Sequence, residues 1–380
     1  MDFRFIDTIS KISCQQWNAL TGTEYPFIRH EFLSALEKSG CVTSEQGWQT
    51  HHLIVEQEQQ IIAITPLYLK HHSYGEFVFD HAWANAYHRS GIDYYPKLVN
   101  AIPFTPCNGP RIAYRNISIE ALAPLLGQCL NHETVRLNAS SWHCLFPEDS
   151  QLHFWQQSGA DQRIACHFHW FNNNYESFED FLSTCKTRKR KEIKRERKKV
   201  IEQGIQFEKL QGDQISEEHI KQFYLFYILT NAKYNGHGGY LNEDFFQRLR
   251  QSMPEQMMLV LAYKDGKCIA GALNFFSLTT LYGRYWGCSE EHEFLHFETC
   301  FYQGIDFCIE NKIQTFDPGA QGEHKIKRGF KPILTSSFHY LAHSQFRHAV
   351  QRYLVEEKKA VLNYQKSRMS LLPFMSINDL

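Results

Sequence analysis

The fold class is indicated by a segment that reads Val260-Leu-Ala-Tyr-Lys-Asp-Gly-Lys-Cys-Ile-Ala-Gly-Ala-Leu-Asn-Phe-Phe276. Its two apolar runs flank Asp265-Gly266, a dipeptide favoured in two-residue hairpin turns, so we expect two antiparallel strands here. About 207 residues earlier, the same order of strand, polar turn and strand occurs in Leu53-Ile-Val-Glu-Gln-Glu-Gln-Gln-Ile-Ile-Ala-Ile-Thr-Pro-Leu-Tyr-Leu69. The chain therefore carries a weak internal repeat.

Each hairpin is followed by a segment that opens with Tyr-Gly, at Tyr74–Asp80 and at Tyr282–Cys288, and we expect a third strand in both. A polar aromatic loop, a helical stretch and a Pro/Gly-rich loop then follow in each half. The Pro/Gly-rich loops are Pro103–Arg111 and Phe316–Phe330. Chance rarely repeats both the element order and the Tyr-Gly placement, so two copies of one mixed α/β unit, each built around a sheet, are the simplest account.

The turn cluster Asn172-Asn173-Asn174 marks the boundary between the copies, which predicts an N-terminal domain over 1–170 and a C-terminal domain over 171–380. A helical pattern without Pro or Gly runs over 178–203 and stops at Gly204. The apolar spacing predicts further elements in the second domain: helices over 217–233, 243–251 and 294–310, a strand over 333–341 and a closing helix over 346–366.

The helix over 178–203 is strongly basic, because Lys186–Lys199 holds ten cations and two acids. Excess like charge weakens a helix unless an anion neutralises it. The segment is therefore either a solvated face or a surface that contacts the phosphates of RNA, a nucleotide cofactor or anionic lipid. The candidate phosphate ligands are Arg188, Lys189, Arg190 and Lys191.

The composition limits the class of protein. Forty basic residues against forty-one acidic residues leave almost no net charge, so the protein as a whole does not attract a polyanion. Affinity for a polyanion would require a local cluster of basic side chains. No apolar run approaches the roughly 18 residues of a membrane span, and the N-terminus lacks a signal-peptide pattern. We expect a cytoplasmic protein, with peripheral membrane contact left open. The eleven cysteines form no C-x-x-C pair and are expected to be reduced.

The loop Phe316–Phe330 is the strongest candidate for binding. Gly319 and Gly322 allow positive φ and a close approach of the backbone to a ligand. Lys325, Lys327 and Arg328 offer donors to an anionic group. The loop therefore suits a phosphorylated or acyl-carrying substrate, although a solvated surface turn has the same composition.

Taken together, the motifs resemble those of the FemAB-like predicted N-acyltransferases of bacteria, which belong to the GNAT superfamily of acyltransferases. The resemblance covers most of the chain. Its motifs are Pro66–Lys70, Gly75–Asp80, Tyr94–Leu98, Pro103–Pro106, Leu295–Glu298 and Phe316–Phe330.

The resemblance implies two tandem GNAT-type acyl-CoA N-acyltransferase-like domains with mixed sheets, as in the Fem aminoacyltransferases. It also implies transfer of an acyl group from acyl-CoA or aminoacyl-tRNA, used as a co-substrate rather than a permanently bound cofactor, to a small-molecule or peptide amine. A tRNA is thus a possible partner. Neither half has the Arg/Gln-x-x-Gly-x-Gly/Ala pyrophosphate loop of acetyl-CoA-dependent members, so the donor stays open.

Acyl transfer to an amine needs a base, an oxyanion donor and sometimes an acid for the leaving group. In this fold the oxyanion donor is commonly a backbone N–H where two central strands splay apart. Candidate bases are Glu298, Asp317, Glu323 and His324, with Tyr285 as the acid. Candidate binding residues are Gly319, Gly322, Arg284, Lys325, Lys327 and Arg328 in the second half, and Asp80, His81 and Arg111 in the first.

Two other classes of function remain open. His292-Glu293-Phe-Leu-His296 fits H-E-x-x-H, which on a helix binds zinc and activates water, so a zinc hydrolase is an alternative. No H-x-x-G-x-x-H continuation follows, and no metal is expected under the acyltransferase interpretation. A non-catalytic RNA- or phospholipid-binding protein that uses the basic helix is the other alternative.

Overall fold

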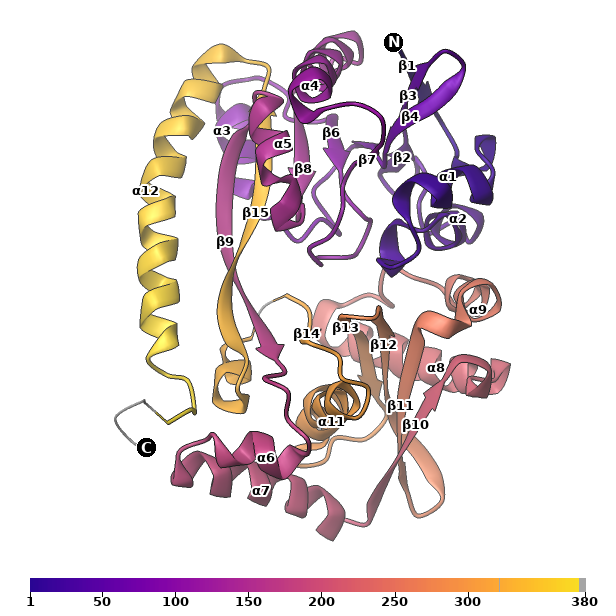
Figure 1. Cartoon of the computed structure of the whole chain (residues 1–380), viewed down its shortest axis with the longest axis vertical. Coiled ribbons are helices and arrows are strands. Elements are labelled where there is room, and N and C mark those ends of the chain that lie inside the picture. Colours follow the sequence, from indigo (N-terminus) through magenta and orange to yellow (C-terminus); the bar gives the residue numbers. More distant parts are fainter. Residues whose placement is uncertain (321, 376–380) are drawn as a thin grey trace. The chain divides into compact units, whose positions relative to one another are not determined.

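The computed structural model describes residues 1–320 and 322–375, and the chain divides into two compact units (Figure 1). The first comprises Met1–Cys166 and Leu334–Tyr364, and the second comprises His167–Ile333 and the chain from Gln365 onward. Strand β15 (Lys331–Leu341) pairs antiparallel with β8 (Ser141–Leu145). Most of the closing helix α12 (Ser344–Met369) therefore belongs to the first unit, whereas the sequence analysis placed it in a domain over 171–380.

The first unit contains two groups of strands. One is a four-stranded sheet in the order β1 (Asp2–Ile6), β3 (His52–Gln57), β4 (Gln60–Thr65), β7 (Ala113–Tyr114). The other runs in the order β15, β8, β6 (Lys97–Asn100), β5 (Tyr68–Lys70), β2 (Trp48–Thr50), with β6 and β8 parallel. The expected hairpin within 53–69 is confirmed as β3–β4.

The expected third strand over Tyr74–Asp80 is wrong, because this segment forms an irregular loop. Phe77 has φ of +59°, which is incompatible with an extended strand. The loop instead turns the carboxylates of Glu76 and Asp80 inward to Lys97. Sequence periodicity could not reveal these ion pairs, because Lys97 lies on a different strand.

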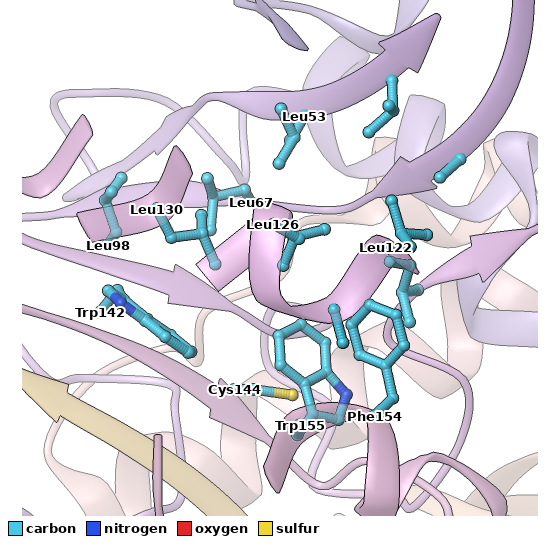
Figure 2. Close-up of a cluster of buried hydrophobic side chains, with 14 of the residues drawn as sticks. Leu53, Leu67, Leu98, Leu122, Leu126, Leu130, Trp142, Cys144, Phe154 and Trp155 are labelled. Carbon is cyan, nitrogen blue, oxygen red and sulfur yellow. The ribbon is translucent and has the colours of Figure 1, made fainter. Parts of the chain in front are cut away.

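The core of the first unit lies between α4 (Ile119–Arg136), α5 (Leu152–Gln157) and the strands (Figure 2). The hydroxyl of Ser118 accepts a hydrogen bond from the N–H of Ala121 and caps α4. Leucines at 122, 126 and 130 then repeat on one face and are fully buried. Each buried leucine contributes roughly 1.5–3 kcal/mol, so this face fixes the helix against the strands.

The second unit contains a mixed sheet in the order β10 (Ile205–Gln211), β11 (Met257–Lys264), β12 (Lys267–Phe276), β13 (Thr280–Cys288), β14 (Thr315–Asp317), with β9 (Asp161–Phe171) beyond β14. Asp265 and Gly266 have φ of +48° and +76°, as a two-residue hairpin turn requires, so the β11–β12 hairpin is confirmed. Neighbouring strands from β10 to β13 are antiparallel, whereas β13 and β14 are parallel.

The helices of the second unit lie within two residues of their expected bounds, with one exception. They are α8 (Glu217–Asn235), α9 (Glu243–Ser252), α10 (Leu295–Phe297), the π-helical turn η6 (Glu298–Tyr302) and α11 (Gln303–Glu310). The single helix expected over 178–203 is two helices, α6 (Phe178–Ser183) and α7 (Thr187–Glu202). The guanidinium of Arg190 donates to the carbonyls of Leu182, Ser183 and Cys185, and so ends α6 without a glycine. No described helix has the length and hydropathy needed to span a membrane.

Candidate active site in the second unit

The parallel strands β13 and β14 separate after a short pairing, and a cavity lies where they diverge. The pairing runs from Thr280↔Thr315 to Tyr282↔Asp317, after which β14 ends and Pro318 offers no N–H to continue the ladder. The cavity has a volume of about 360 Å³. Its walls include Gly283, Arg284, Tyr285, Trp286, His296, Cys300, Pro318, Ala320, Gly322, His324 and Lys325.

A β-bulge borders this cavity on the other side of β13. The register between β12 and β13 shifts at Leu273/Asn274, and Asn274 pairs with Gly283, the first residue of β13 beyond the parallel pairing. The Asn274 amide donates to the carbonyls of Met258 and Ala272, which fixes the bulge. Bulges re-aim backbone and side chains beside functional sites, and this one lies against the cavity wall.

Two cations line the cavity, Arg284 and Lys325. Lys325 lies in the short 3-10 helix η7 (Glu323–Arg328), which begins after Gly322 with φ of +104°. Its buried ammonium donates to the carbonyl oxygens of Gly319, at 2.8 Å, and Pro318, at 3.3 Å. Gly319 and Gly322 have the positive φ that was expected of them, at +83° and +104°.

Arg328 does not line this cavity and is already bound to an anion of the chain itself. Its guanidinium forms a bidentate ion pair with the buried carboxylate of Glu196 on α7, at 2.8–3.1 Å, and stacks 3.3 Å from the ring centroid of Phe297. The prediction that Arg328 binds substrate therefore requires correction: the group is structural. Lys327 is exposed and also lies outside the cavity wall.

Asp317 and Glu298, both expected to be bases, contact other side chains of the chain and lie outside the cavity wall. Although burial opposes ionisation, His169 and the N–H of Gly319 keep the pKa of Asp317 below its usual range. Asp317 is thus an ionised residue that shapes the turn. Burial raises the pKa of Glu298, but Arg197 pairs with its carboxylate at 3.0 Å. Neither geometry supports a catalytic base.

His324 is the predicted base that does line the cavity, together with Tyr285 as the predicted acid. Partial desolvation and the nearby cations Lys325 and Arg328 lower the pKa of His324 to about 4, so its imidazole, which is still accessible to solvent, is neutral near pH 7. Glu323 is exposed and lies 3.3 Å from Arg368, away from the cavity wall.

Sequence reasoning missed His296 and Cys300 as members of this wall. Burial, His324 and Lys325 lower the pKa of His296 to about 4, so this imidazole is neutral as well. Burial raises the pKa of the Cys300 thiol well above its usual value, which removes the thiolate that a nucleophile requires. In the sequence His296 stood out only within the H-E-x-x-H and Leu295–Glu298 motifs, and Cys300 carried no signal of its own.

The H-E-x-x-H motif does not have the geometry that a zinc site needs. Helix α10 begins at Leu295, so His292 precedes the helix and does not share a face with His296. His292 lies 3.2 Å from Glu290, while His296 packs against the ring of Trp286. Among the residues that the structure describes, no group of three or more His, Cys, Asp or Glu side chains is placed to hold a metal.

The predicted polar group of the first unit is used structurally. Arg111 is fully buried and donates to the carbonyls of Leu145, Cys107 and Pro110. His81 is exposed at the start of α3 (His81–Arg89). Asp80 accepts from Lys97 and from the hydroxyl of Tyr94, so Asp80 and Arg111 are both engaged within the chain.

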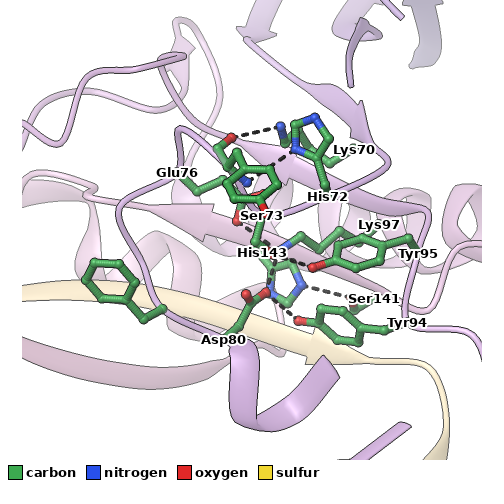
Figure 3. A network of polar contacts seen from close by, with 12 residues as sticks. Lys70, His72, Ser73, Glu76, Asp80, Tyr94, Tyr95, Lys97, Ser141 and His143 are labelled. Atoms are coloured by element: carbon green, nitrogen blue, oxygen red, sulfur yellow. Dashed lines mark hydrogen bonds and ion pairs between the residues drawn. The ribbon is translucent and has the colours of Figure 1, made fainter. Parts of the chain in front are cut away.

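Asp80 belongs to a buried ionic network (Figure 3). Lys97 is fully buried and contacts Asp80, Glu76 at 2.8 Å and the hydroxyl of Ser73 at 2.9 Å. Burial raises the pKa of Glu76 to about 7, whereas Lys97 more than offsets burial at Asp80 and keeps the pKa of that carboxyl below its usual range. The network fastens the loop Tyr74–Asp80 to strand β6.

The basic helix α7 separates into two faces. Lys189 pairs with Glu192, and Arg190 caps α6, so two of the predicted phosphate ligands are engaged within the chain. Ile193, Glu196 and Val200 are buried. An exposed stripe of cations at helical spacing occupies the opposite face, and none has a side-chain partner among residues 1–320 and 322–375: Arg188, Lys191, Arg195 and Lys199.

This stripe leads to a first prediction. Changing its four cations to Gln should weaken binding of a fluorescent single-stranded RNA at low salt and flatten the salt dependence by roughly 0.7 log units for each phosphate that is no longer neutralised. Changing four exposed cations of α12, Arg352, Lys358, Lys359 and Lys366, is the matched control. Equal RNA affinity for both variants would show that the stripe is only solvated.

The architecture and a family match together place the chain. The mixed sheet, whose parallel strands β13 and β14 separate beside the cavity, confirms the expected α/β fold. The chain matches the FemAB-like family, described as peptidoglycan biosynthesis/recognition, over residues 8–376. It therefore belongs to that family.

Solved structures agree on the fold. FemX is 11% identical, with a TM-score of 0.53 over 92% of this chain and 100% of FemX. The C-terminal domain of a protein assigned as a lysylphosphatidylglycerol synthetase from Agrobacterium fabrum is 10% identical, with a TM-score of 0.52 over 89% of this chain and 94% of that domain. A conserved protein of unknown function from Bacteroides thetaiotaomicron, 10% identical, covers 89% of this chain and 99% of its own, with a TM-score of 0.50. A search of curated proteins finds no significant sequence match.

Proposed function

We propose that this protein is an N-acyltransferase that moves an acyl or aminoacyl group to an amine, and that the reaction occurs in the cavity between β13 and β14. The observation that carries this proposal is the separation of the two parallel strands beside a cavity of about 360 Å³ with cationic and neutral imidazole side chains in its wall. Membership of the FemAB-like family, a family of acyltransferases, supports the same reaction class.

The residues present fit the steps of acyl transfer. Lys325 and Arg284 place positive charge where a carbonyl oxygen becomes negative in the tetrahedral intermediate. A neutral imidazole of the wall, His324 or His296, takes a proton from the attacking amine. Tyr285 can donate a proton to the leaving group. Since the Cys300 thiol is held neutral, we propose direct attack by the amine without an acyl-cysteine intermediate.

The donor is a thioester or an ester, acyl-CoA or aminoacyl-tRNA, and the local charge disfavours a CoA diphosphate at the segment that follows β13. The segment Ser289–Phe294, between β13 and α10, carries three carboxylates and no glycine. Carboxylates repel a diphosphate, which a glycine-rich helix start would instead bind. We place the reaction in the cytoplasm, where both donors occur.

The test uses both donors without presupposing either. The purified protein is incubated with a pool of aminoacyl-tRNAs or a set of acyl-CoAs and with primary amines, and products are identified by mass spectrometry. Small molecules and tRNA carried through purification are analysed in parallel. Amide products are expected with at least one donor class. The absence of transfer from both classes would contradict the proposal.

A second prediction concerns the cavity cations. Arg284→Met should lower turnover roughly ten- to a hundredfold, because a charge-assisted contact is worth about 1.5–3 kcal/mol. Lys325→Met should lower turnover similarly and also reduce stability, since its ammonium holds Pro318 and Gly319. Lys327→Ala, an exposed cation of the same short helix, is the matched control. Full activity of both cavity variants would place the active site elsewhere.

A further inference from the structure

A second cavity adjoins the first and shares two side chains with it. It has a volume of about 430 Å³ and lies between the end of β13, the start of α10 and helix α8. Trp286 and His296 line both cavities, with their ring centroids 5.2 Å apart. The two cavities therefore meet at an aromatic pair, so a molecule in each would have its reacting atoms close to the same imidazole.

The second cavity has the opposite charge to the first. Glu290, Glu291 and His292 contribute to its wall, and Tyr234 and Trp286 add aromatic rings. Carboxylates beside aromatic faces are the chemistry that recognises an alkylammonium. A donor anion would bind in the first cavity, with Arg284 and Lys325, rather than here.

The chain itself supplies an example of this recognition. The ammonium of Lys233 contacts the carboxylate of Glu291 and lies 5.5 Å from the ring centroid of Tyr234. The hydroxyl of Tyr234 donates to the same carboxylate at 2.9 Å. Lys233 and Glu291 are both more than half exposed, so their pairing is weak and can be exchanged for a ligand's ammonium.

We infer that the second cavity binds the acceptor as a primary alkylammonium, and that His296 receives a proton from it as the amine attacks a donor in the first cavity. The inference rests on the proposed function and adds the place and chemical class of the acceptor. Glu290 and Glu291 bind the charge, Tyr234 and Trp286 cover the alkyl chain, and His296 is the shared base. The acidic segment Ser289–Phe294, which disfavours a diphosphate, would thus bind the ammonium of the acceptor.

Two protons leave the acceptor nitrogen during the transfer. The ammonium first loses one proton to solvent, and the amine nitrogen then forms a bond to the acyl carbon while the bond from that carbon to the ester oxygen or thioester sulfur breaks. The second proton leaves the nitrogen for His296 and passes to the departing oxygen or sulfur. The products are an amide and the free hydroxyl or thiol.

The charged or titratable groups near His296 are His324, Lys325 and Arg328, with Glu290, Glu291 and His292 across the second cavity.

Acceptor binding is tested without a donor, so that its failure is separable from failure of the proposed function. n-Pentylamine and its neutral counterpart 1-pentanol are titrated at low salt, and binding is followed through the histidine C2–H resonances. Pentylamine should bind at least tenfold more tightly than pentanol. Its binding should shift the C2–H resonance of His296, which is identified as the signal that is absent in His296→Gln. Glu290→Gln with Glu291→Gln should weaken pentylamine about tenfold and leave pentanol unchanged. Glu218→Gln, an exposed residue of α8, is the control.

The role of His296 is tested with the donor that the transfer assay identifies. His296→Gln should lower kcat about a hundredfold with little change in the KM for the amine. The double variant Glu290→Gln with Glu291→Gln should instead raise this KM and retain kcat. His348→Gln, exposed on α12, is the control. Equal pentylamine affinity with and without the two carboxylates would overturn the acceptor site, and unchanged kcat in His296→Gln would overturn its role as base. Binding of pentylamine without transfer from any donor would contradict the proposed function alone.

Discussion

Arg328→Ala is expected to destabilise the second unit by about 3–5 kcal/mol rather than to weaken substrate binding in an intact fold. The substitution would leave the carboxylate of Glu196, which is buried, with the hydroxyl of Tyr302 but no cation. An uncompensated buried charge costs this much in proteins, whereas an exposed pair costs about 1 kcal/mol or less. The stacking of the guanidinium on Phe297 is removed as well.

Urea unfolding followed by tryptophan fluorescence measures this loss. Arg328→Met combined with Glu196→Leu should recover most of the stability, because removing both charges eliminates the unpaired one. The matched control is Arg248→Ala, which breaks the exposed pair with Asp244 and should change stability by less than about 1 kcal/mol. If Arg328→Ala instead unfolds at the same urea concentration as the wild-type protein and has reduced turnover, Arg328 binds substrate.

Local patterns predicted much of the second unit from sequence alone. Asp265-Gly266 favours its own turn, and the continuous apolar runs on either side predict β11 and β12 from local sequence alone. The break between α6 and α7 escaped prediction, because α6 is capped by the side chain of Arg190, five to eight residues further along the chain, rather than by a glycine. The irregular Tyr74–Asp80 loop escaped for a different reason, since its conformation depends on Lys97, which lies on another element.

The candidate site was predicted in part. The loop around Gly322 and Lys325 was located by its composition, because glycines beside cations are a local signal. The sequence could not show which cation faces the cavity. The partner of Arg328 is Glu196, which lies more than a hundred residues away in the basic helix α7. His296 was noticed as a zinc ligand and not as a base, because only the separation of β13 from β14 brings it to the cavity.

Lys97→Met is expected to destabilise the first unit by about 3–5 kcal/mol at pH 8, since Glu76 and Asp80 would then be buried without their shared cation. One buried oxygen of each carboxylate already lacks a hydrogen-bond partner within the described chain. The hydroxyl of Tyr94 at Asp80 and the charge of Lys70, which forms no ion pair with either carboxylate within the described chain, would be the remaining stabilising groups. Lys97→Met combined with Glu76→Gln and Asp80→Asn should recover part of the loss, which distinguishes unpaired charge from lost packing.

The pH dependence of this loss follows from the direction of the pKa shifts. Lys97 opposes the rise that burial causes at Glu76 and Asp80, so its removal should move both folded pKa values upward. The pKa of Glu76 should move further above its unfolded value of 4.5, and the pKa of Asp80 should move from below its unfolded value of 3.8 to above it. A carboxyl whose folded pKa exceeds its unfolded pKa contributes stability that is complete below the unfolded value and is lost as pH rises through the folded value. The stability gap between the wild-type protein and Lys97→Met should therefore be smallest near pH 4–5 and grow toward pH 8. Urea midpoints measured across this range check the sign, and a gap that shrinks as pH rises would show that the two carboxylates do not depend on Lys97.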